Sequence, residues 1–396
     1  MEYYNFSPRR YFDIVKREIV HPIFKVALLD YNENVIQEIT RDISSNNNGS
    51  IDINYQQGVR RSCSITFIDP YGEYIPDVNK GVFWLNQKFK LYVGLEDLDT
   101  GDKYWFSQGV FYVNDPIINR TEKIVTINGV DKFGFFGSEL NYNQLEGTYL
   151  IPEGTRVFDA IINILLLDRG NGQVIDPIAP ILDVTYKNNV LPYDINKSPG
   201  SYLGDILIEI ANVLGANIYY NTEGQLVLSS GTLDMSYSNK SPVYEFIDVL
   251  PEYGDSSLRY DYVNAINSIT VVGSNINGAV YQYTAENRNP MSPLRIDLIG
   301  KKTGAIVETS NAGSLNDVMA YAKFLLNYKS IVQMAVDFSS SFLPHLKEDE
   351  VIEITDRYYK YEKERFIIQS IKIPLNPLDK MTISASNITS LPYYEL

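Results

Sequence analysis

One long β-hairpin pattern occurs twice in this sequence, and it constrains the fold more than any other feature. Residues 109–128 read GVFYVNDPIINRTEKIVTIN, and residues 365–384 read RFIIQSIKIPLNPLDKMTIS. Each begins with alternating apolar residues around an aromatic side chain, crosses a turn rich in proline and asparagine, passes an acid–lysine pair and resumes a strand-like run. Similar strands precede both copies. The sequence therefore predicts a domain duplication rather than a solenoid array.

Strand-like runs separated by Gly, Asn, Asp and Pro clusters fill residues 23–132 and return beyond residue 240. Runs at this spacing are typical of an antiparallel barrel or sandwich. Between them, apolar residues recur at helical spacing after the N-cap candidates Thr155 and Ser201, Gly215 stands just past the second helix, and a hairpin follows it. A third helix is predicted to begin at Ser314, with Asp317 at its third helical position.

The predicted fold is mostly β with α/β insertions. It consists of two similar antiparallel β-barrel domains and a middle α/β region. The predicted boundaries are an N-terminal arm over 1–19, the first β-barrel over 20–140, the middle region over 141–235, and the second β-barrel over 236–396 with an insertion at 275–330. The arm carries Arg9, Arg10, Lys16 and Arg17. It is either a short helix that docks on a neighbouring molecule or a solvated tail.

Charge and cysteine content exclude several classes of protein. The net charge of −15 argues against an outer surface that grips nucleic-acid phosphates, although DNA could slide past such a protein without binding. Cys63 is the only cysteine, so no disulfide framework or multi-cysteine metal site can form, and its alternating neighbours place it on a strand. No apolar segment indicates a secretory signal or a membrane span. We expect synthesis in a bacterial cytoplasm.

Catalytic patterns are missing from the sequence. His21 and His345 are framed by no motif and are expected in loops at the surface or at an interface. No phosphate-binding glycine motif is present. The DLDTGD turn at 97–102 lacks the spacing of a calcium loop. These observations predict no enzymatic activity, no cofactor and no metal.

Two further residue groups are candidate sites. The acids of residues 348–356 could supply paired carboxylates for glycosidic cleavage, but a solvated acidic loop is the simpler interpretation. The pairs Tyr219–Tyr220 and Tyr358–Tyr359 could stack on sugars, but such residues more often fill cores and interfaces.

In three segments the chain resembles a known family. The run GVFYVNDP…KIVTINGVDKFGFFGSEL, the middle segment SPGSYLGDILIEIANVLGANIYYNTEGQLVLSS, and the closing DEVIEITD…RFIIQSIKIPLNPLDKMTISAS are similar to those of bacteriophage baseplate and tail central hub proteins. The related set includes the N-terminal region of siphophage tail-associated proteins and the spike hub of type VI secretion. The resemblance spans roughly residues 20–390 and rests on order and texture rather than on invariant motifs.

The resemblance implies a homotrimer that is a structural virion protein of the tail baseplate. Three chains, each with two tube-like barrels, would form a ring of six similar units between a sixfold tail tube and a threefold spike. Its implied partners are the tail tube or distal tail protein ring, the central spike and the tape measure protein. DNA would pass through a channel without specific binding. The acids Asp97, Asp99 and Asp102 are candidates for its lining. No lysozyme or peptidase domain is expected.

Two alternative functions stay open at this stage. The first is a carbohydrate-binding or glycosidase module of the baseplate, which predicts a monomer with a cleft lined by tyrosines and two carboxylates. The second is a distal tail protein ring, which predicts hexamers and leaves the internal duplication without a use.

Overall fold

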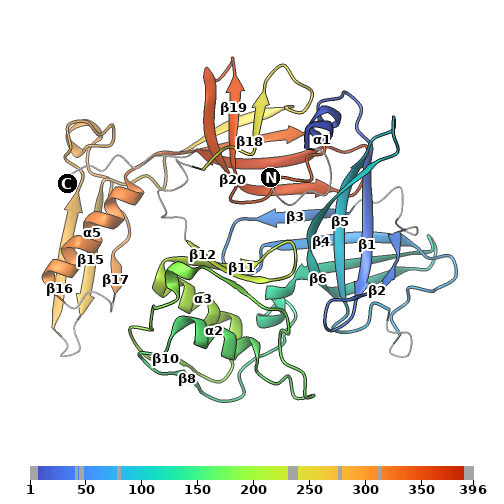
Figure 1. The fold of residues 1–396 in the computed structure, drawn as a ribbon. Helices are drawn as coiled ribbons and strands as arrows, with labels where there is room; N and C mark the ends of the chain where they lie inside the picture. Colours follow the sequence, from blue (N-terminus) through green and yellow to red (C-terminus); the bar gives the residue numbers. More distant parts are fainter. Residues whose placement is uncertain are drawn as a thin grey trace.

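A computed structural model describes residues 8–40, 43, 49–77, 82–230, 240–274, 279–309 and 314–387 of the chain. Strands are the commonest element among the described residues, and the largest sheet contains 13 of them. The mostly β fold predicted from the sequence is thus confirmed (Figure 1). No helix among the described residues is both long enough and apolar enough to cross a membrane.

The first set of strands comes from the N-terminal third of the chain. Hydrogen bonding arranges these strands in the order β3-β4-β7-β6-β5-β1-β2, and every pairing in the set is antiparallel. The strands are β1 (Pro22–Leu29), β2 (Val35–Glu38), β3 (Ser50–Asn54), β4 (Arg61–Ile68), β5 (Lys88–Glu96), β6 (Lys103–Asn119) and β7 (Ile124–Asp131).

The second set comes from the C-terminal third and repeats this order. Its strands are arranged β14-β18-β21-β20-β19-β13, so β14 takes the place of β3, β18 of β4, β21 of β7, β20 of β6 and β19 of β5. The pairings are antiparallel except that of β13 with β19, which is parallel. The strands are β13 (Tyr244–Ile247), β14 (Ser256–Asp261), β18 (Gln333–Ser340), β19 (Val351–Asp356), β20 (Tyr361–Pro374) and β21 (Met381–Asn387).

A β-bulge also recurs at the same place in both sets. The register of β6 against β7 shifts between Asn114 and Ile117, and the register of β20 against β21 shifts between Ile368 and Ser370. A bulge lets one strand change partners along its length. Before the bulge, β6 pairs with β5 and β20 pairs with β19. Beyond the bulge, β6 and β20 each continue past the end of that pairing.

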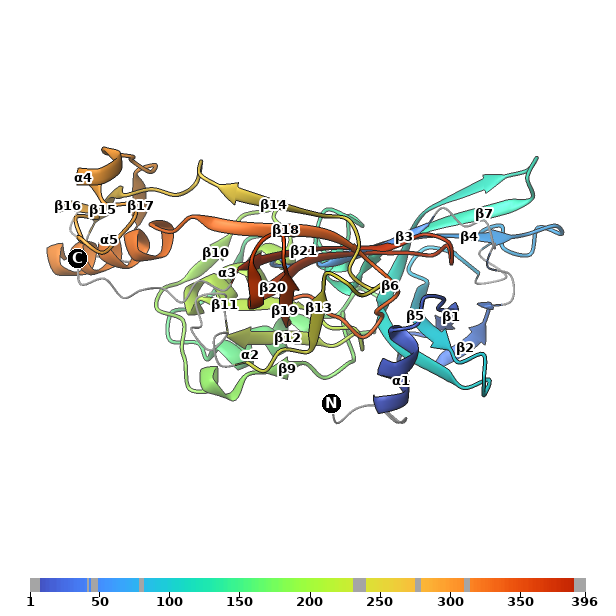
Figure 2. The ribbon, with the colours of Figure 1, turned by 90° about the horizontal axis from the view of Figure 1, so that it is seen from above.

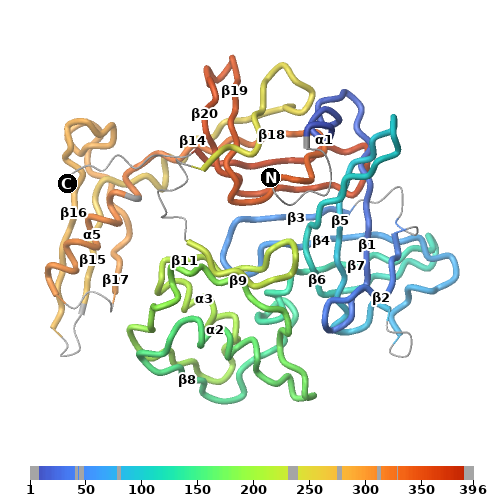
Figure 3. The backbone as a smooth tube through the Cα atoms, viewed as in Figure 1, coloured from blue at the N-terminus to red at the C-terminus, as the bar shows by residue number. Residues whose placement is uncertain are grey.

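The two sets form one sheet rather than two separate barrels. Beyond its bulge, the segment Ser370–Pro374 of β20 pairs with β3 of the first set. Figure 3 shows β3 running beside the C-terminal strands. Within the described residues, β2 pairs only with β1 and β14 only with β18, so the sheet stays open at both ends. The expectation of two β-barrels within the chain is therefore corrected: β20 joins the two strand sets and does not close a barrel from its own set.

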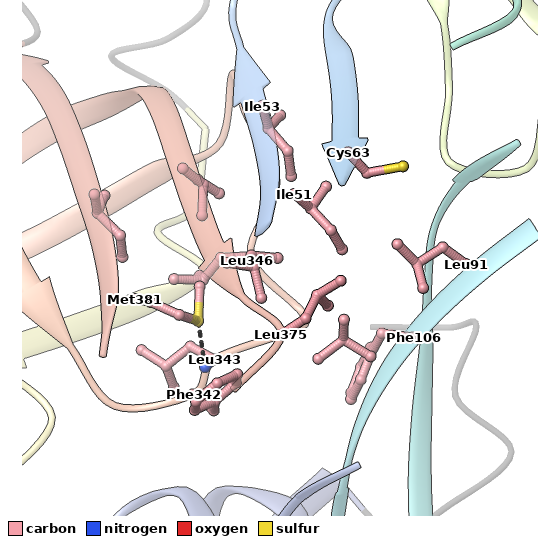
Figure 4. Close-up of a cluster of buried hydrophobic side chains, with 14 of the residues drawn as sticks. Ile51, Ile53, Cys63, Leu91, Phe106, Phe342, Leu343, Leu346, Leu375 and Met381 are labelled. Atoms are coloured by element: carbon pink, nitrogen blue, oxygen red, sulfur yellow. Dashed lines mark hydrogen bonds between the residues drawn. The ribbon is translucent and has the colours of Figure 1, made fainter. Parts of the chain in front are cut away.

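A single hydrophobic core lies under both sets. Figure 4 shows Ile51, Ile53, Cys63 and Leu91 of the first set beside Phe342, Leu343, Leu346, Leu375 and Met381 of the second. The backbone N–H of Leu343 donates to the Met381 sulfur at 3.0 Å. Cys63 is buried on β4, as predicted, and burial raises the pKa of its thiol. Because the core is shared, neither set is expected to fold without the other.

The middle region packs two helices against small sheets. Its elements are η2 (Lys132–Phe136), β8 (Tyr149–Ile151), α2 (Val157–Leu165), β9 (Ile181–Leu182), η3 (Val184–Tyr186), β10 (Ile195–Lys197), α3 (Leu203–Leu214), β11 (Ala216–Tyr220) and β12 (Leu226–Ser230).

The ends of these helices agree only in part with the sequence prediction. Gly215 ends α3 in the left-handed conformation at φ 62°, which a glycine adopts without strain. The N-caps, however, are Arg156 and Tyr202 rather than Thr155 and Ser201. The Thr155 hydroxyl donates instead to the Pro152 carbonyl, and the Asp205 carboxylate accepts from the Tyr202 N–H.

A small peripheral unit interrupts the second set between β14 and β18. It contains β15 (Ser268–Ser274), β16 (Val280–Glu286), α4 (Ile296–Ile299), β17 (Val307–Thr309) and α5 (Leu315–Lys329). Helix α5 begins at the predicted Ser314 cap and packs on β15 and β16 over a separate small core. Figure 1 places the unit at one end of the molecule. The corresponding position in the first set, between β3 and β4, holds only a short loop.

The N-terminal helix α1 (Pro8–Val15) packs on its own chain. Tyr11, Ile14 and Val15 are buried in the main core, and the Tyr11 ring lies 5.0 Å from that of Phe106 on β6. The short helix expected for the arm is present, and it packs on its own chain rather than forming a solvated tail.

Candidate functional site

The most extensive candidate surface is the face of the large sheet opposite the core. Along β4 the residues alternate strictly: Cys63, Ile65 and Phe67 are buried, whereas Ser62, Ser64 and Thr66 point the other way and stay accessible. The same alternation continues on β3, β7, β20 and β21. Small hydroxyl and amide side chains thus cover much of this face, which we call the polar face.

The polar face is continuous across the junction between the two strand sets. Residues directly opposite one another on paired strands share a face. One such row runs Asp337, Ser384, Ser370 and Asn54; the next runs Thr382, Lys372, Asp52 and Ser62. Since β20 and β3 come from different sets, the polar face belongs to the sheet as a whole.

A depression of about 480 Å³ lies in the polar face at this junction. It is lined by the carboxylates of Asp52, Asp255 and Asp337 against the single ammonium of Lys372. Lys372 Nζ lies 3.5 Å from Asp52 Oδ1, so the excess negative charge rests on the other two acids. The rest of the lining is Ser, Thr and Asn together with Ile53, Phe338, Ile371 and Ile383, and it includes no histidine or cysteine. Such a surface offers hydrogen bonds and repels anions, but it contains no activated nucleophile.

The three acids singled out from the sequence lie elsewhere, in the turn between β5 and β6 beside α1. Asp97 is buried and paired with Arg10 of α1 at 2.5 Å and with Arg17 at 3.3 Å. Asp99 is exposed and pairs with Arg17 at 2.9 Å, and Asp102 is exposed as well. Of the three, only Asp99 and Asp102 present a carboxylate to solvent.

The Asp97 carboxylate anchors α1. Burial alone would raise the pKa of Asp97, but hydrogen bonds from Arg10, the Asp99 N–H and Thr100 outweigh it and lower the pKa below its ordinary value. The carboxylate therefore stays ionised at neutral pH. The sequence did not reveal this pairing, because Asp97 looked like one more solvated acid in an acidic turn.

His345 is buried beneath α1, which corrects the expectation of a surface or interface histidine. Its Nδ1 lies 2.7 Å from the Tyr11 hydroxyl, and the rings of Phe12, Phe106 and Tyr244 surround it. Burial lowers the pKa of His345 from 6.5 to about 3. The imidazole is therefore neutral in the folded chain, and its position in a turn after Pro344 gave no sign of that.

Acid should weaken the folded chain through His345. Below pH 6.5 the unfolded chain gains a proton on His345 that the folded chain cannot accept until about pH 3, so stability falls as pH falls through this window. We expect a loss of about 2 kcal/mol between pH 7.5 and pH 5. The measurement is urea unfolding of the wild type and of His345→Gln at both pH values.

The comparison with His345→Gln is needed because Glu350 acts in the opposite direction. Burial raises the pKa of Glu350 to about 7, so its protonation in the folded state adds stability as pH falls below 7. The difference between wild type and variant isolates the histidine. Equal pH dependence in the two proteins would contradict a neutral buried His345.

An ion cluster lies buried where the two strand sets meet the middle region. Arg61 Nη2 contacts both carboxylate oxygens of Glu348 at 2.5 Å, and Arg60 Nη1 lies 3.5 Å from the same carboxylate. The Arg60 guanidinium stacks 3.4 Å from the Tyr219 ring centroid. Arg61 also donates to the Tyr220 carbonyl at 2.8 Å. β4, β11 and the loop before β19 are thus held by one cluster.

This cluster corrects one sequence interpretation and agrees with another. Glu348 is buried, so it does not belong to a solvated acidic loop. Tyr220 is buried and the Arg60 guanidinium covers the half-buried Tyr219 ring, as expected of a pair that fills a core or an interface. The Arg61 side chain points to the same face of β4 as Cys63, Ile65 and Phe67. This alternation in the sequence could have indicated that Arg61 is buried.

A second buried cluster joins the first set to the middle region. Lys132 Nζ lies 2.6 Å from Glu33 Oε1, 2.8 Å from Asp176 Oδ2 and 2.8 Å from the carbonyl oxygen of Gly224. The Tyr220 hydroxyl donates to Asp176 at 2.7 Å. Both clusters fix the orientation of neighbouring parts of the chain, and neither opens onto the depression.

Comparison with known proteins gives matches in structure alone. No protein-family model matches the sequence, and a search of the curated proteins by sequence finds no match. Among solved structures, a tail protein from Neisseria meningitidis MC58 superposes with a TM-score of 0.60 at 12% identity, over 92% of this chain and 96% of that chain. The 43 kDa tail protein of prophage MuSo2 from Shewanella oneidensis gives 0.58 at 12% identity, over 92% and 98%.

A third match comes from an assembly. A chain of the half-lidded PdpA-VgrG complex of Francisella gives a TM-score of 0.56 at 9% identity, over 98% of this chain and 62% of that chain. The likeness at these identities is one of fold, and it extends over nearly all of the chain. The chain therefore shares its fold with the phage tail proteins, as its sequence resemblance to the tail hub family predicted.

Proposed function

We propose that the chain is a structural, non-enzymatic subunit of a phage tail, and that three copies form the central hub of its baseplate. The observation that carries the proposal is the repeated strand order, β3-β4-β7-β6-β5 and β14-β18-β21-β20-β19, within one sheet. Three copies of a chain that contains this unit twice present six similar units around a ring, and the ring still has true threefold symmetry. Such a ring can adapt a sixfold tail tube to a threefold spike.

In this proposal the polar face lines the channel through which DNA passes. Ser, Thr and Asn side chains with an excess of carboxylates favour transit, because lysines in their place would bind phosphate. Asp99 and Asp102 are proposed as further acids near the channel mouth. Each strand set becomes part of a closed barrel only through its neighbours in the ring. The proposed units are 20–140, 141–235 and 236–396, with an insertion within 275–330.

The proposed partners are the tail tube or distal tail protein ring on one side and the central spike on the other, with the tape measure protein and DNA in the channel. The similarity to a chain of the PdpA-VgrG complex supports a spike-type partner. The proposed location is the virion tail, after synthesis in the host cytoplasm.

Mass measurement tests the oligomer. Light scattering of the purified chain should give three times the chain mass of 45.1 kDa, and the complex co-expressed with its spike should contain three copies of the chain. A monomer under both conditions contradicts the hub. A hexamer favours the distal tail ring instead.

A charge reversal tests the channel lining. Asp255→Lys together with Asp337→Lys places two new lysines beside Lys372 in the depression. We expect affinity for duplex DNA to rise at least about tenfold at low salt and to fall steeply as salt increases. Fluorescence anisotropy with a labelled duplex measures it. The control is Asp297→Lys on exposed α4, with a second exposed lysine substitution at Glu308 on β17 to match the charge change. Equal gains in both proteins would argue against a special role for the polar face.

A further inference from the structure

One strand pairing joins the two sets inside the chain, and the equivalent pairing of the repeat is not made there. Within the chain, β3 pairs with the last residues of β20. By strand order β14 corresponds to β3, and β6 corresponds to β20. Yet in the described part of the chain β14 pairs on one side only, and the end of β6, Asn114–Asn119, pairs only with β7. β14 and the end of β6, which correspond to the paired strands β3 and β20, therefore each keep an open edge.

We propose that β14 of one copy pairs antiparallel with the end of β6 of a second copy of this chain, in the register of the internal β3–β20 pairing. The inference rests on the proposed ring and specifies its subunit interface. The contact is heterologous, with different surfaces on the two sides, and such contacts close into a ring when the rotation permits. Main-chain hydrogen bonds along the added strand would supply the association, as in β-augmentation.

The matching bulges fix the β6 side of the register. The first pair beyond the bulge is Ile117 with Thr126 in the first set and Ser370 with Ser384 in the second. Ile117 therefore corresponds to Ser370, and Ile118 corresponds to Ile371.

The next strands fix the β14 side. Thr126 lies opposite Thr66 on β4, and Ser384 lies opposite Asp337 on β18, so Thr66 corresponds to Asp337. Four residues earlier on each strand, Ser62 pairs with Asp52 and Gln333 pairs with Asp261. Asp261 thus corresponds to Asp52, and Tyr262 corresponds to Ile53. Since Ile371 pairs with Ile53 inside the chain, Ile118 should pair with Tyr262 between chains.

The exposed apolar side chains at these positions support the pairing independently of the register argument. Ile117 and Ile118 are 58% and 45% exposed, and Tyr262 and Val263 are 66% and 81% exposed. Tyr260 stacks on Tyr262 with the ring centroids 5.9 Å apart. Ile117 and Ile118 lie on the end of β6, whereas Tyr262 and Val263 lie in the turn directly after β14. Exposed apolar residues beside open strand edges mark interaction sites. The register brings these two apolar groups together.

A rival edge exists at the far end of the sheet. β2 is exposed along its length, and Val35 and Ile36 are 61% and 63% exposed. Pairing of β14 with β2 would also extend the sheet between copies. The repeat contains no internal model for it, since β2 has no counterpart in the second set. β2 therefore serves as the matched control.

Disulfide trapping in the full chain tests the pairing. Opposite residues in an antiparallel pair have Cα atoms about 4.5–5.5 Å apart, which a disulfide spans. Figure 2 places β14 far from the β6–β7 hairpin, on the side of the peripheral unit, so a bond between them joins two copies. Native Cys63 is buried and does not compete. Ile118→Cys and Tyr262→Cys chains are mixed under mild oxidation and analysed on non-reducing gels, beside light scattering of the wild type.

We expect covalent dimers from this mixture, covalent trimers from the doubly substituted chain, and no dimers from Val35→Cys mixed with Tyr262→Cys. A trimeric wild type without the 118–262 bond, or with the 35–262 bond instead, overturns the pairing and leaves the hub standing. A monomeric wild type without any bond overturns both. As a second measurement, Ile118→Asp should weaken self-association by about 10- to 100-fold, as loss of a hot-spot residue does, without changing the circular dichroism. Unchanged association would also overturn the pairing.

Discussion

Replacing Glu348 with alanine should lower the free energy of unfolding by about 3–5 kcal/mol. The carboxylate is buried between Arg60 and Arg61, whose side chains are 1% and 2% exposed. Removing it leaves two buried guanidinium groups without a counter-charge. Holding these charges away from water costs free energy in the folded state, and unfolding removes that cost because it exposes them to solvent. Urea unfolding at pH 7.5 measures the loss. Glu364→Ala on the exposed start of β20 is the control and should change stability by less than about 0.5 kcal/mol.

A double substitution separates charge burial from packing. Arg61→Met combined with Glu348→Leu removes both partners of the closest pair and keeps the site filled. It should cost less than Glu348→Ala alone, because only the Arg60 guanidinium, rather than two guanidinium groups, is left without a counter-charge and the site stays filled. If the double variant is as unstable as the sum of the two single variants, the residues do not interact and the cluster does not hold the three regions together.

The strands were predictable because their local pattern is strong. On β4 and β7 the alternation of buried and accessible residues is strict, and the same alternation of residue types in the sequence suffices to place Cys63 on a strand. Turn residues between the strands marked most boundaries. The Ser314 cap of α5 and the Gly215 end of α3 followed from side-chain and backbone chemistry that operates within a few residues.

Long-range features could not be predicted in the same way. The pairing of β20 with β3 depends on a second register beyond a bulge, and nothing in either segment specifies a partner hundreds of positions away. The burial of Glu348 depends on Arg61, which lies in the other strand set. A charged residue reveals its burial only through its phase on a strand, and Glu348 lies in a loop where no phase exists.

The candidate site shows the same division. The acids at 97–102 stood out because they cluster in the sequence, yet the Asp97 carboxylate is buried in ion pairs with Arg10 and Arg17. The polar face gives no local signal, since its residues are spread over strands from both ends of the chain and each is an ordinary serine, threonine or asparagine. Only the cross-strand rows make it one surface. A surface composed across strands is invisible to a search for local motifs.

Lys132 is one of the buried residues that hold the middle region to the first strand set, and Lys132→Met should therefore loosen it. The substitution leaves Asp176, with a side chain 2% exposed, without its cation, and Glu33 with Lys88 alone. We expect a loss of about 3–5 kcal/mol, as for other buried pairs from which one partner is removed. Hydrogen exchange should rise first in β11 and β12, because Lys132 also holds the Gly224 carbonyl at their turn.

A neighbouring ion pair provides the matched control for Lys132. Lys90 pairs with Glu223 at 2.5 Å in the same β11–β12 turn, but the Glu223 side chain is 57% exposed. Lys90→Met removes a lysine of the same size that reaches the same hairpin from β5, and because its partner Glu223 faces solvent we expect a loss of at most about 1 kcal/mol. Similar losses in the two variants would show that burial of Lys132 does not matter. Fast exchange throughout the sheet, rather than in β11 and β12 first, would show that the cluster stabilises the whole chain instead of fastening the middle region.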